Sequence, residues 1–206
     1  MGLLGNRLPE DKWARALLAA AVTLGYLLLA YLIGWAIESM VGAQAEYRVL
    51  SSLPMLAICL AVFLLWGPRG DRGGSTPAVA AALAVAAGAA ACAIGLLPGA
   101  GQTLTPTALN IACAGIAAPI AEELLFRGFI LGRLEESAGS VFALIVSAVL
   151  FAVAHIGAGG APVVLASAAA GLLFGAVYLK TRSVAWPILA HVIANLAALT
   201  LSALLV

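Results

Sequence analysis

The sequence predicts an all-α protein, a polytopic bundle of about seven transmembrane helices. Of the 206 residues, 64% are hydrophobic and only 9% are charged, whereas soluble domains carry roughly 25% charged residues. Apolar runs follow one another along the chain, and several are near the ~20 residues that cross a ~30 Å hydrocarbon core. No alternating ten-residue pattern typical of a membrane barrel is present, so the spans are predicted to be helices.

The predicted spans begin and end at charges and at clusters of Gly and Pro. The first apolar run, Ala16 to Ile37, is too long for the apolar core of a signal peptide, so it is predicted to be a retained helix. A chain of this length leaves no room for a separate soluble domain, so residues 1–206 are expected to form a single integral membrane domain. The seven spans are Trp13–Ile37, Val49–Trp66, Pro77–Leu97, Pro106–Leu131, Ser140–Gly157, Ala161–Leu179 and Val184–Leu205.

The distribution of basic residues predicts the orientation of the bundle. Of the ten Lys and Arg residues, only Arg48 lies on the predicted outer side of the membrane, and Arg127 lies inside span four. Since Lys and Arg accumulate in cytoplasmic loops, the N-terminus is predicted to be cytoplasmic and the C-terminus outside. The net charge of +1 argues against nucleic acid as a partner. The eight basic residues on the predicted cytoplasmic side are Arg7, Lys12, Arg15, Arg69, Arg72, Arg133, Lys180 and Arg182.

Three ionisable residues, Glu122, Glu123 and Arg127, lie within the apolar fourth span. Each costs roughly 2.5–3.5 kcal/mol to insert at membrane depth, so such residues are usually functional. Glu123 and Arg127 are four residues apart and are predicted to form an ion pair on one helix face. A buried pair that only fixes helix packing would explain these two residues but would leave Glu122 without a role.

Other polar residues are predicted at a similar depth, roughly 11–22 Å along their helices from the predicted cytoplasmic ends. They are His155 in span five, which shares a face with Phe151, and His191 and Asn195, one turn apart in span seven. Each histidine alone is equally compatible with a hydrogen bond that joins two helices. Together with two carboxylates at matching depth, they favour one shared site.

The patterns Glu122-Glu123-x3-Arg127, Phe151-x3-His155 and His191-x3-Asn195, in this order, resemble those of a known superfamily. It is the CAAX prenyl endopeptidase and bacteriocin-processing (CPBP, or Abi) group of intramembrane proteases. The resemblance covers residues of about 115–200, and the helices of about 106–205 would form its catalytic core. It implies an intramembrane endopeptidase that cleaves a membrane-associated peptide.

Peptide hydrolysis requires an activated water, a proton donor and a stabiliser of the oxyanion. The hypothesis makes Glu122 the general base, assisted by His155, while His191 and Asn195 donate to the oxyanion. Glu123, Arg127 and Phe151 would orient these groups, and the resemblance implies the same division of roles. The chain has no His-Glu-x-x-His, no Gly-x-Ser-x-Gly and no Asp in a span, so the nucleophile is expected to be water.

No cofactor is expected, and the enzyme is predicted to be of the glutamate type and independent of metal. Glu122, His155 and His191 could supply three zinc ligands. Zinc is disfavoured because it would leave Asn195 without a role and because Glu123, the available orienting carboxylate, is expected to pair with Arg127.

Two other functions remain open. One is a non-proteolytic protein of the same fold, acting in immunity or as a scaffold. The other is a proton-coupled transporter, which the lack of an inverted repeat disfavours. The substrate is open as well: a prenylated C-terminal peptide, a bacteriocin leader and a signal peptide are all compatible. The Ala bias and short loops suggest a prokaryotic plasma membrane, with the site expected to open toward the cytoplasmic side.

Overall fold

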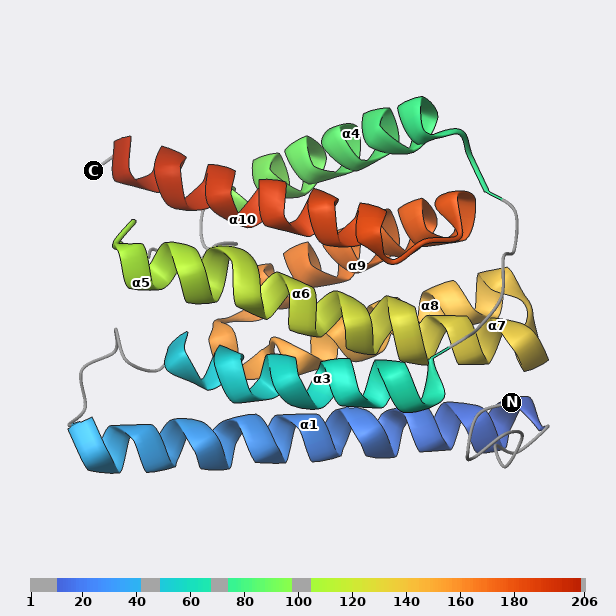
Figure 1. Cartoon of the computed structure of the whole chain (residues 1–206), viewed down its shortest axis with the longest axis horizontal. Coiled ribbons are helices and arrows are strands. Elements are labelled where there is room, and N and C mark those ends of the chain that lie inside the picture. Colours follow the sequence, from blue (N-terminus) through green and yellow to red (C-terminus); the bar gives the residue numbers. More distant parts are fainter. Residues whose placement is uncertain (1–10, 42–48, 68–73, 98–104, 205–206) are drawn as a thin grey trace.

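A computed structural model describes residues 11–41, 49–67, 74–97 and 105–204, and every regular element in these ranges is a helix (Figure 1). The helices are α1 (Lys12–Val41), η1 (Val49–Ser51), α3 (Ser52–Trp66), α4 (Pro77–Gly95), α5 (Ala108–Asn110), η2 (Ile111–Ala117), α6 (Ala118–Glu123), η3 (Leu124–Leu131), α7 (Gly132–Ala138), α8 (Ser140–Ala154), η4 (Ile156–Ala158), α9 (Ala161–Thr181) and α10 (Ala185–Leu204).

Each predicted span corresponds to a helical segment, which confirms the all-α membrane bundle. Two of these segments, η1 with α3 and the helix α10, are apolar and correspond to the predicted spans Val49–Trp66 and Val184–Leu205. Five are long and apolar enough to cross a membrane, so the protein is an integral membrane protein. These five are Trp13–Ile37, Pro77–Gly95, Ala108–Ala138, Ser140–Ala158 and Ala161–Thr181.

The segment from α5 to α7 is one continuous helix that is π-helical over η2 and η3. Wide π-helical turns leave backbone groups for partners outside the helix, and they recur at functional sites. In η3 the carbonyl of Phe126 accepts a hydrogen bond of 2.9 Å from the buried Ser147 hydroxyl of α8. The two π-helical segments flank α6, which carries both glutamates of the fourth span.

The region 133–140, predicted to be a loop, is mostly helical, and the chain breaks only at Gly139, whose φ is +78°. The predicted span ended at Leu131, before the charged residues Arg133, Glu135 and Glu136, but these residues form ion pairs at the end of the helix. Glu136 accepts from Arg15 of α1 at 3.2 Å and from Arg133 at 3.1 Å. Glu135 accepts from Arg182 at the end of α9 at 2.6 Å.

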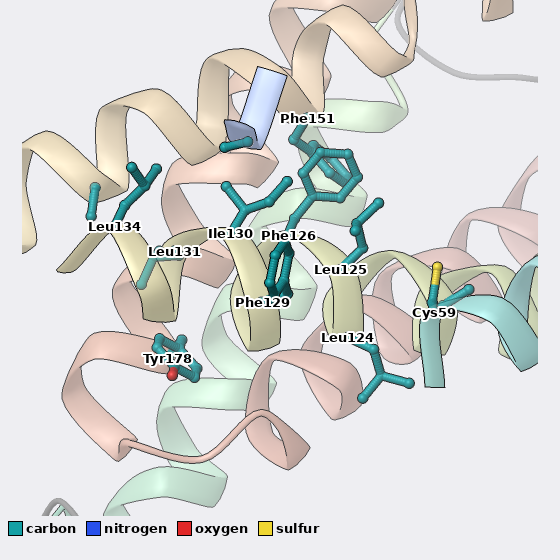
Figure 2. Close-up of a cluster of buried hydrophobic side chains, with 13 residues drawn as sticks. Cys59, Leu124, Leu125, Phe126, Phe129, Ile130, Leu131, Leu134, Phe151 and Tyr178 are labelled. Carbon is teal, nitrogen blue, oxygen red and sulfur yellow. The ribbon is translucent and has the colours of Figure 1, made fainter. Parts of the chain in front are cut away.

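The continuous central helix packs against α3, α8 and α10, and α4 packs against α9 and α10 (Figure 1). Around η3 lies an apolar core that takes Phe151 from α8, Tyr178 from α9 and Cys59 from α3 (Figure 2). Gly128 permits the approach of α3, because a Cβ there would lie 2.6 Å from the Phe63 ring. Gly157 of η4, in contrast, has nothing within 4 Å of a Cβ.

The ion pairs gather Arg15, Arg133 and Arg182 at one end of the bundle, as the predicted topology requires. Four of the other basic residues used in that prediction, Arg7, Arg48, Arg69 and Arg72, lie outside the described residues.

A Ser137→Cys variant tests the topology, since Ser137 lies in α7 at this basic end. In sealed cells an impermeant maleimide should leave it unlabelled, and labelling should appear after permeabilisation. Strong labelling in intact cells would reverse the orientation.

Candidate active site

The predicted ion pair between Glu123 and Arg127 is present and fully buried. Arg127 Nη1 donates to Glu123 Oε1 at 2.8 Å, and neither side chain is exposed. Arg127 Nη2 donates to the Gly171 carbonyl of α9 at 3.1 Å, so the guanidinium joins the central helix to α9. Its Cζ lies 4.5 Å from the centre of the Phe151 ring, within the range of a cation–π contact.

Glu123 also orients His191. Its Oε1 lies 2.9 Å from Nδ1 of this histidine, which reaches in from α10. A carboxylate paired with Arg127 can only accept, so Nδ1 carries a proton and donates it. In the neutral ring Nε2 is then a lone-pair acceptor, and it lies 4.0 Å from Glu122 Oε2. The glutamate expected to serve only Arg127 therefore holds a histidine as well.

His155 is oriented in the same way by the backbone. At the C-terminal end of α8, its Nδ1 lies 2.8 Å from the Phe151 carbonyl, which can only accept. The neutral ring therefore presents Nε2 as an acceptor, again 4.0 Å from Glu122 Oε2. His155 at the end of α8 and His191 of α10 thus converge on one carboxylate oxygen of Glu122 in α6, and all three residues were predicted to share a site.

Aromatic rings surround these groups. Phe151, which is buried, lies 4.6 Å from the His155 ring and 5.8 Å from the His191 ring, centre to centre. Phe174 of α9 stacks on His191 at 4.8 Å, a contact that the sequence analysis missed. The signal available in the sequence was weak: Phe174 is the one aromatic residue between Ala161 and Val177 in a helix of small side chains.

Gly171 explains how α9 comes close enough for its carbonyl to reach Arg127. A Cβ at this position would lie 3.0 Å from Ala148 Cα of α8, tighter than most real contacts. The small residue therefore lets two helix backbones approach closely. Substitution here would displace the carbonyl that accepts from Arg127.

Asn195 lies one turn beyond His191 on α10. Its Nδ2 donates to the Ala114 carbonyl of the π-helical η2 at 2.9 Å, so the side chain joins these two helices. An amide nitrogen carries two hydrogens, and this bond uses one of them. Asn110 of α5 donates instead to the Thr105 carbonyl at 2.8 Å.

Glu122 forms part of the wall of a cavity of about 180 Å³ between α1, α3 and the central helix. Tyr26 and Ala30 of α1 and Met55 of α3 line it, and none of these residues was predicted to belong to the site. Further lining residues are Val49, Ser51, Ser52, Ala114, Ala118 and Ala121.

The cavity extends from Glu122 toward the η1 end of the bundle, away from the basic end where α7 pairs with α1 and α9. In the predicted topology the η1 end lies outside. This cavity therefore gives no support to a site that opens toward the cytoplasmic side. The depth of a residue along its helix does not show which helices leave space between them.

Within the described ranges, no group of three or more His, Cys, Asp or Glu side chains is arranged to hold a metal ion. The three residues considered as zinc ligands are nevertheless close together, with both imidazole Nε2 atoms 4.0 Å from the same oxygen.

Residues 104–197 match the protein family described as type II CAAX prenyl endopeptidase Rce1-like. This match covers less than half of the chain, and over these residues the chain is similar to the Rce1-like family. The matched region contains all of the predicted site residues, from Glu122 to Asn195, and it begins beyond α1, α3 and α4.

A curated protein is similar to part of this chain. A protein of Bacillus subtilis (strain 168) named "Putative membrane peptidase YdiL" is 34% identical over 87 residues. The match covers 42% of this chain and 34% of the relative, about a third of its length. No solved structure matches the chain. Over part of its length the chain is therefore similar to a family of membrane proteases and to a protein named as a putative membrane peptidase.

Proposed function

We propose that this protein is an intramembrane endopeptidase that cleaves a membrane-associated peptide with a water molecule activated by Glu122. The observation that carries the proposal is the convergence of His155 Nε2 and His191 Nε2 on Glu122 Oε2, each at 4.0 Å. This separation is too long for a direct hydrogen bond and suits a water that bridges the groups. With its Nδ1 donating to the Phe151 carbonyl, His155 presents Nε2 to that water as an acceptor, so Glu122 and His155 can take its two hydrogens.

In the first step Glu122 Oε2 takes a proton from the water as its oxygen attacks the carbonyl carbon of the scissile peptide bond. The new C–O bond forms as the carbonyl π bond opens, which leaves a tetrahedral intermediate with a negatively charged oxygen. His155 assists by accepting the second hydrogen of the water and so aligning it. General base catalysis of this kind requires the base within hydrogen-bond reach of the water.

In the second step the C–N bond breaks, and the proton held by Glu122 passes to the leaving nitrogen. The products are a carboxylic acid, which ionises, and an amine, and Glu122 regains its charge. Stabilisation of the oxyanion is assigned to the free amide hydrogen of Asn195 and to His191. For this role His191 carries a hydrogen on Nε2 as well as on the Nδ1 that lies 2.9 Å from Glu123 Oε1.

Glu123, Arg127 and Phe151 act in this proposal as orienting residues. They position His191, close the space around the rings and tie the central helix to α9. The helices from about residue 106 to 205 would form the catalytic core. The substrate would be a peptide or protein of the surrounding bilayer, and the location a prokaryotic plasma membrane.

Comparison of protein N-termini in membranes tests this function. Membranes that contain the wild-type protein should show new N-termini in membrane-associated proteins, and membranes that contain Glu122→Ala should lack them. The same precursors should be enriched with purified Glu122→Ala, which binds them without cutting. A wild type that generates no new termini would favour an immunity or scaffolding role instead.

The proposed mechanism predicts that catalysis needs no metal. Cleavage should continue after exhaustive treatment with EDTA and 1,10-phenanthroline, and elemental analysis of active protein should give far less than one zinc per chain. Activity that chelation removes and zinc alone restores would assign Glu122, His155 and His191 to metal binding.

A further inference from the structure

The cavity beside Glu122 has the properties of a binding subsite. Its walls are mainly apolar, with Ala30 of α1, Met55 of α3 and Ala118 of α6 among the lining residues, while Tyr26, Ser51, Ser52 and Glu122 add polar groups. Met55 is almost fully buried and closes one side. Tyr26 is held in place by Phe126, whose ring lies 6.3 Å away and nearly perpendicular.

The size of the cavity limits what it can hold. An apolar cavity of about 150 Å³ in an engineered protein accepts benzene. The cavity here, about 180 Å³, therefore accommodates one side chain of the size of Leu, Met or Phe. Its volume depends on small residues, since alanine occupies four lining positions on α1, η2 and α6: Ala30, Ala114, Ala118 and Ala121.

The position of Glu122 relates the cavity to the cleavage site. Its side chain forms part of the cavity wall, and its Oε2 faces His155 and His191. A peptide with its carbonyl carbon beside the activated water would therefore have a neighbouring side chain directed at the cavity. The chemistry of the lining selects an apolar side chain.

We propose that this cavity is the specificity subsite of the protein and accepts the medium-sized apolar side chain of the substrate residue next to the scissile bond. The inference rests on the proposed function, because it places the reacting carbonyl beside Glu122. Tyr26, Ala30 and Met55 lie before the region matched to the family.

An Ala30→Leu variant tests the subsite because it fills the cavity from α1 and leaves the sequence of the helix that carries Glu122 unchanged. The probes are fluorescence-quenched apolar peptides of one parent sequence, in phosphatidylethanolamine/phosphatidylglycerol vesicles. In the first set, Ala, Leu, Phe or Trp stands at the position just before the cleaved bond. In the second set, the same four residues stand at the position just after it. Ala30→Leu should lower kcat/KM for the Phe peptide about tenfold or more relative to the Ala peptide.

Ala21→Leu is the matched control, since it makes the same change at an exposed position of α1 and should leave the preference of the wild type unchanged. Met55→Ala should shift the preference in the opposite direction and improve cleavage of the Trp peptide. Cleavage by Ala30→Leu with an unchanged preference in both peptide sets would overturn the subsite and leave the proposed function intact.

A binding measurement separates the two proposals. The same peptides are titrated against Glu122→Gln and Glu122→Gln/Ala30→Leu, with fluorescence anisotropy as the readout. Phe-selective binding that the second substitution abolishes would support the subsite even if the wild type cleaves nothing, an outcome that would contradict only the proposed function. Binding with no dependence on side-chain size would overturn the subsite.

Discussion

Glu122→Gln should abolish cleavage and leave the bundle folded. The amide has the shape of the carboxylate but does not take a proton from water, and loss of a general base costs about 10²–10⁴-fold in rate. At 1.36 kcal/mol per tenfold, this corresponds to about 2.7–5.4 kcal/mol of transition-state stabilisation. The fold should tolerate the change because the two histidines approach Glu122 only to 4.0 Å, so no buried partner loses a short hydrogen bond.

The measurement is kcat/KM on a cleaved peptide, together with thermal melting in the same detergent. Glu136→Gln is the matched control, since it removes the charge of a partly exposed glutamate that pairs with Arg15 and Arg133 at the basic end. It should keep the rate of the wild type. A Glu122→Gln protein that still cleaves within a few-fold of the wild-type rate would remove Glu122 from the role of base.

The main features of the site could be predicted from the sequence. Inserting a polar residue into the membrane costs free energy, so such a residue in an apolar span usually has a function. Glu123 and Arg127 were predicted to pair from their spacing alone, and the pair is present. Glu122, His155 and His191 were predicted to meet because their depths matched, and the structure brings them together. In both cases a local rule, helix periodicity or membrane depth, determines the outcome.

What the sequence did not reveal depends on packing between distant segments. The orientation of His191 depends on Glu123 accepting two hydrogen bonds, which spacing on one helix does not specify. The contact of Arg127 with the Gly171 carbonyl joins η3 to α9 at a position where α8 and α9 approach closely. The cavity at Glu122 requires α1, in which the sequence indicated no site residue.

Arg127→Ala should have the opposite effect from Glu122→Gln: it should destabilise the protein before any question of catalysis arises. The substitution removes two hydrogen bonds and the contact with Phe151, and it leaves the Glu123 carboxylate fully buried without its cation. Breaking one side of a buried ion pair costs about 3–5 kcal/mol. We expect a large loss of folded protein on extraction and a markedly lower melting temperature.

Two further variants show whether the uncompensated charge is the cause. Arg133→Ala breaks a partly exposed pair and should cost about 1 kcal/mol or less. Glu123→Gln combined with Arg127→Met removes both charges at once, so it should recover part of the stability lost in Arg127→Ala. Cleavage by this double variant should remain low, because an amide in place of Glu123 no longer holds the His191 ring through a carboxylate at Nδ1. If Arg127→Ala melted like Glu122→Gln, the assignment of one glutamate to structure and the other to catalysis would be wrong.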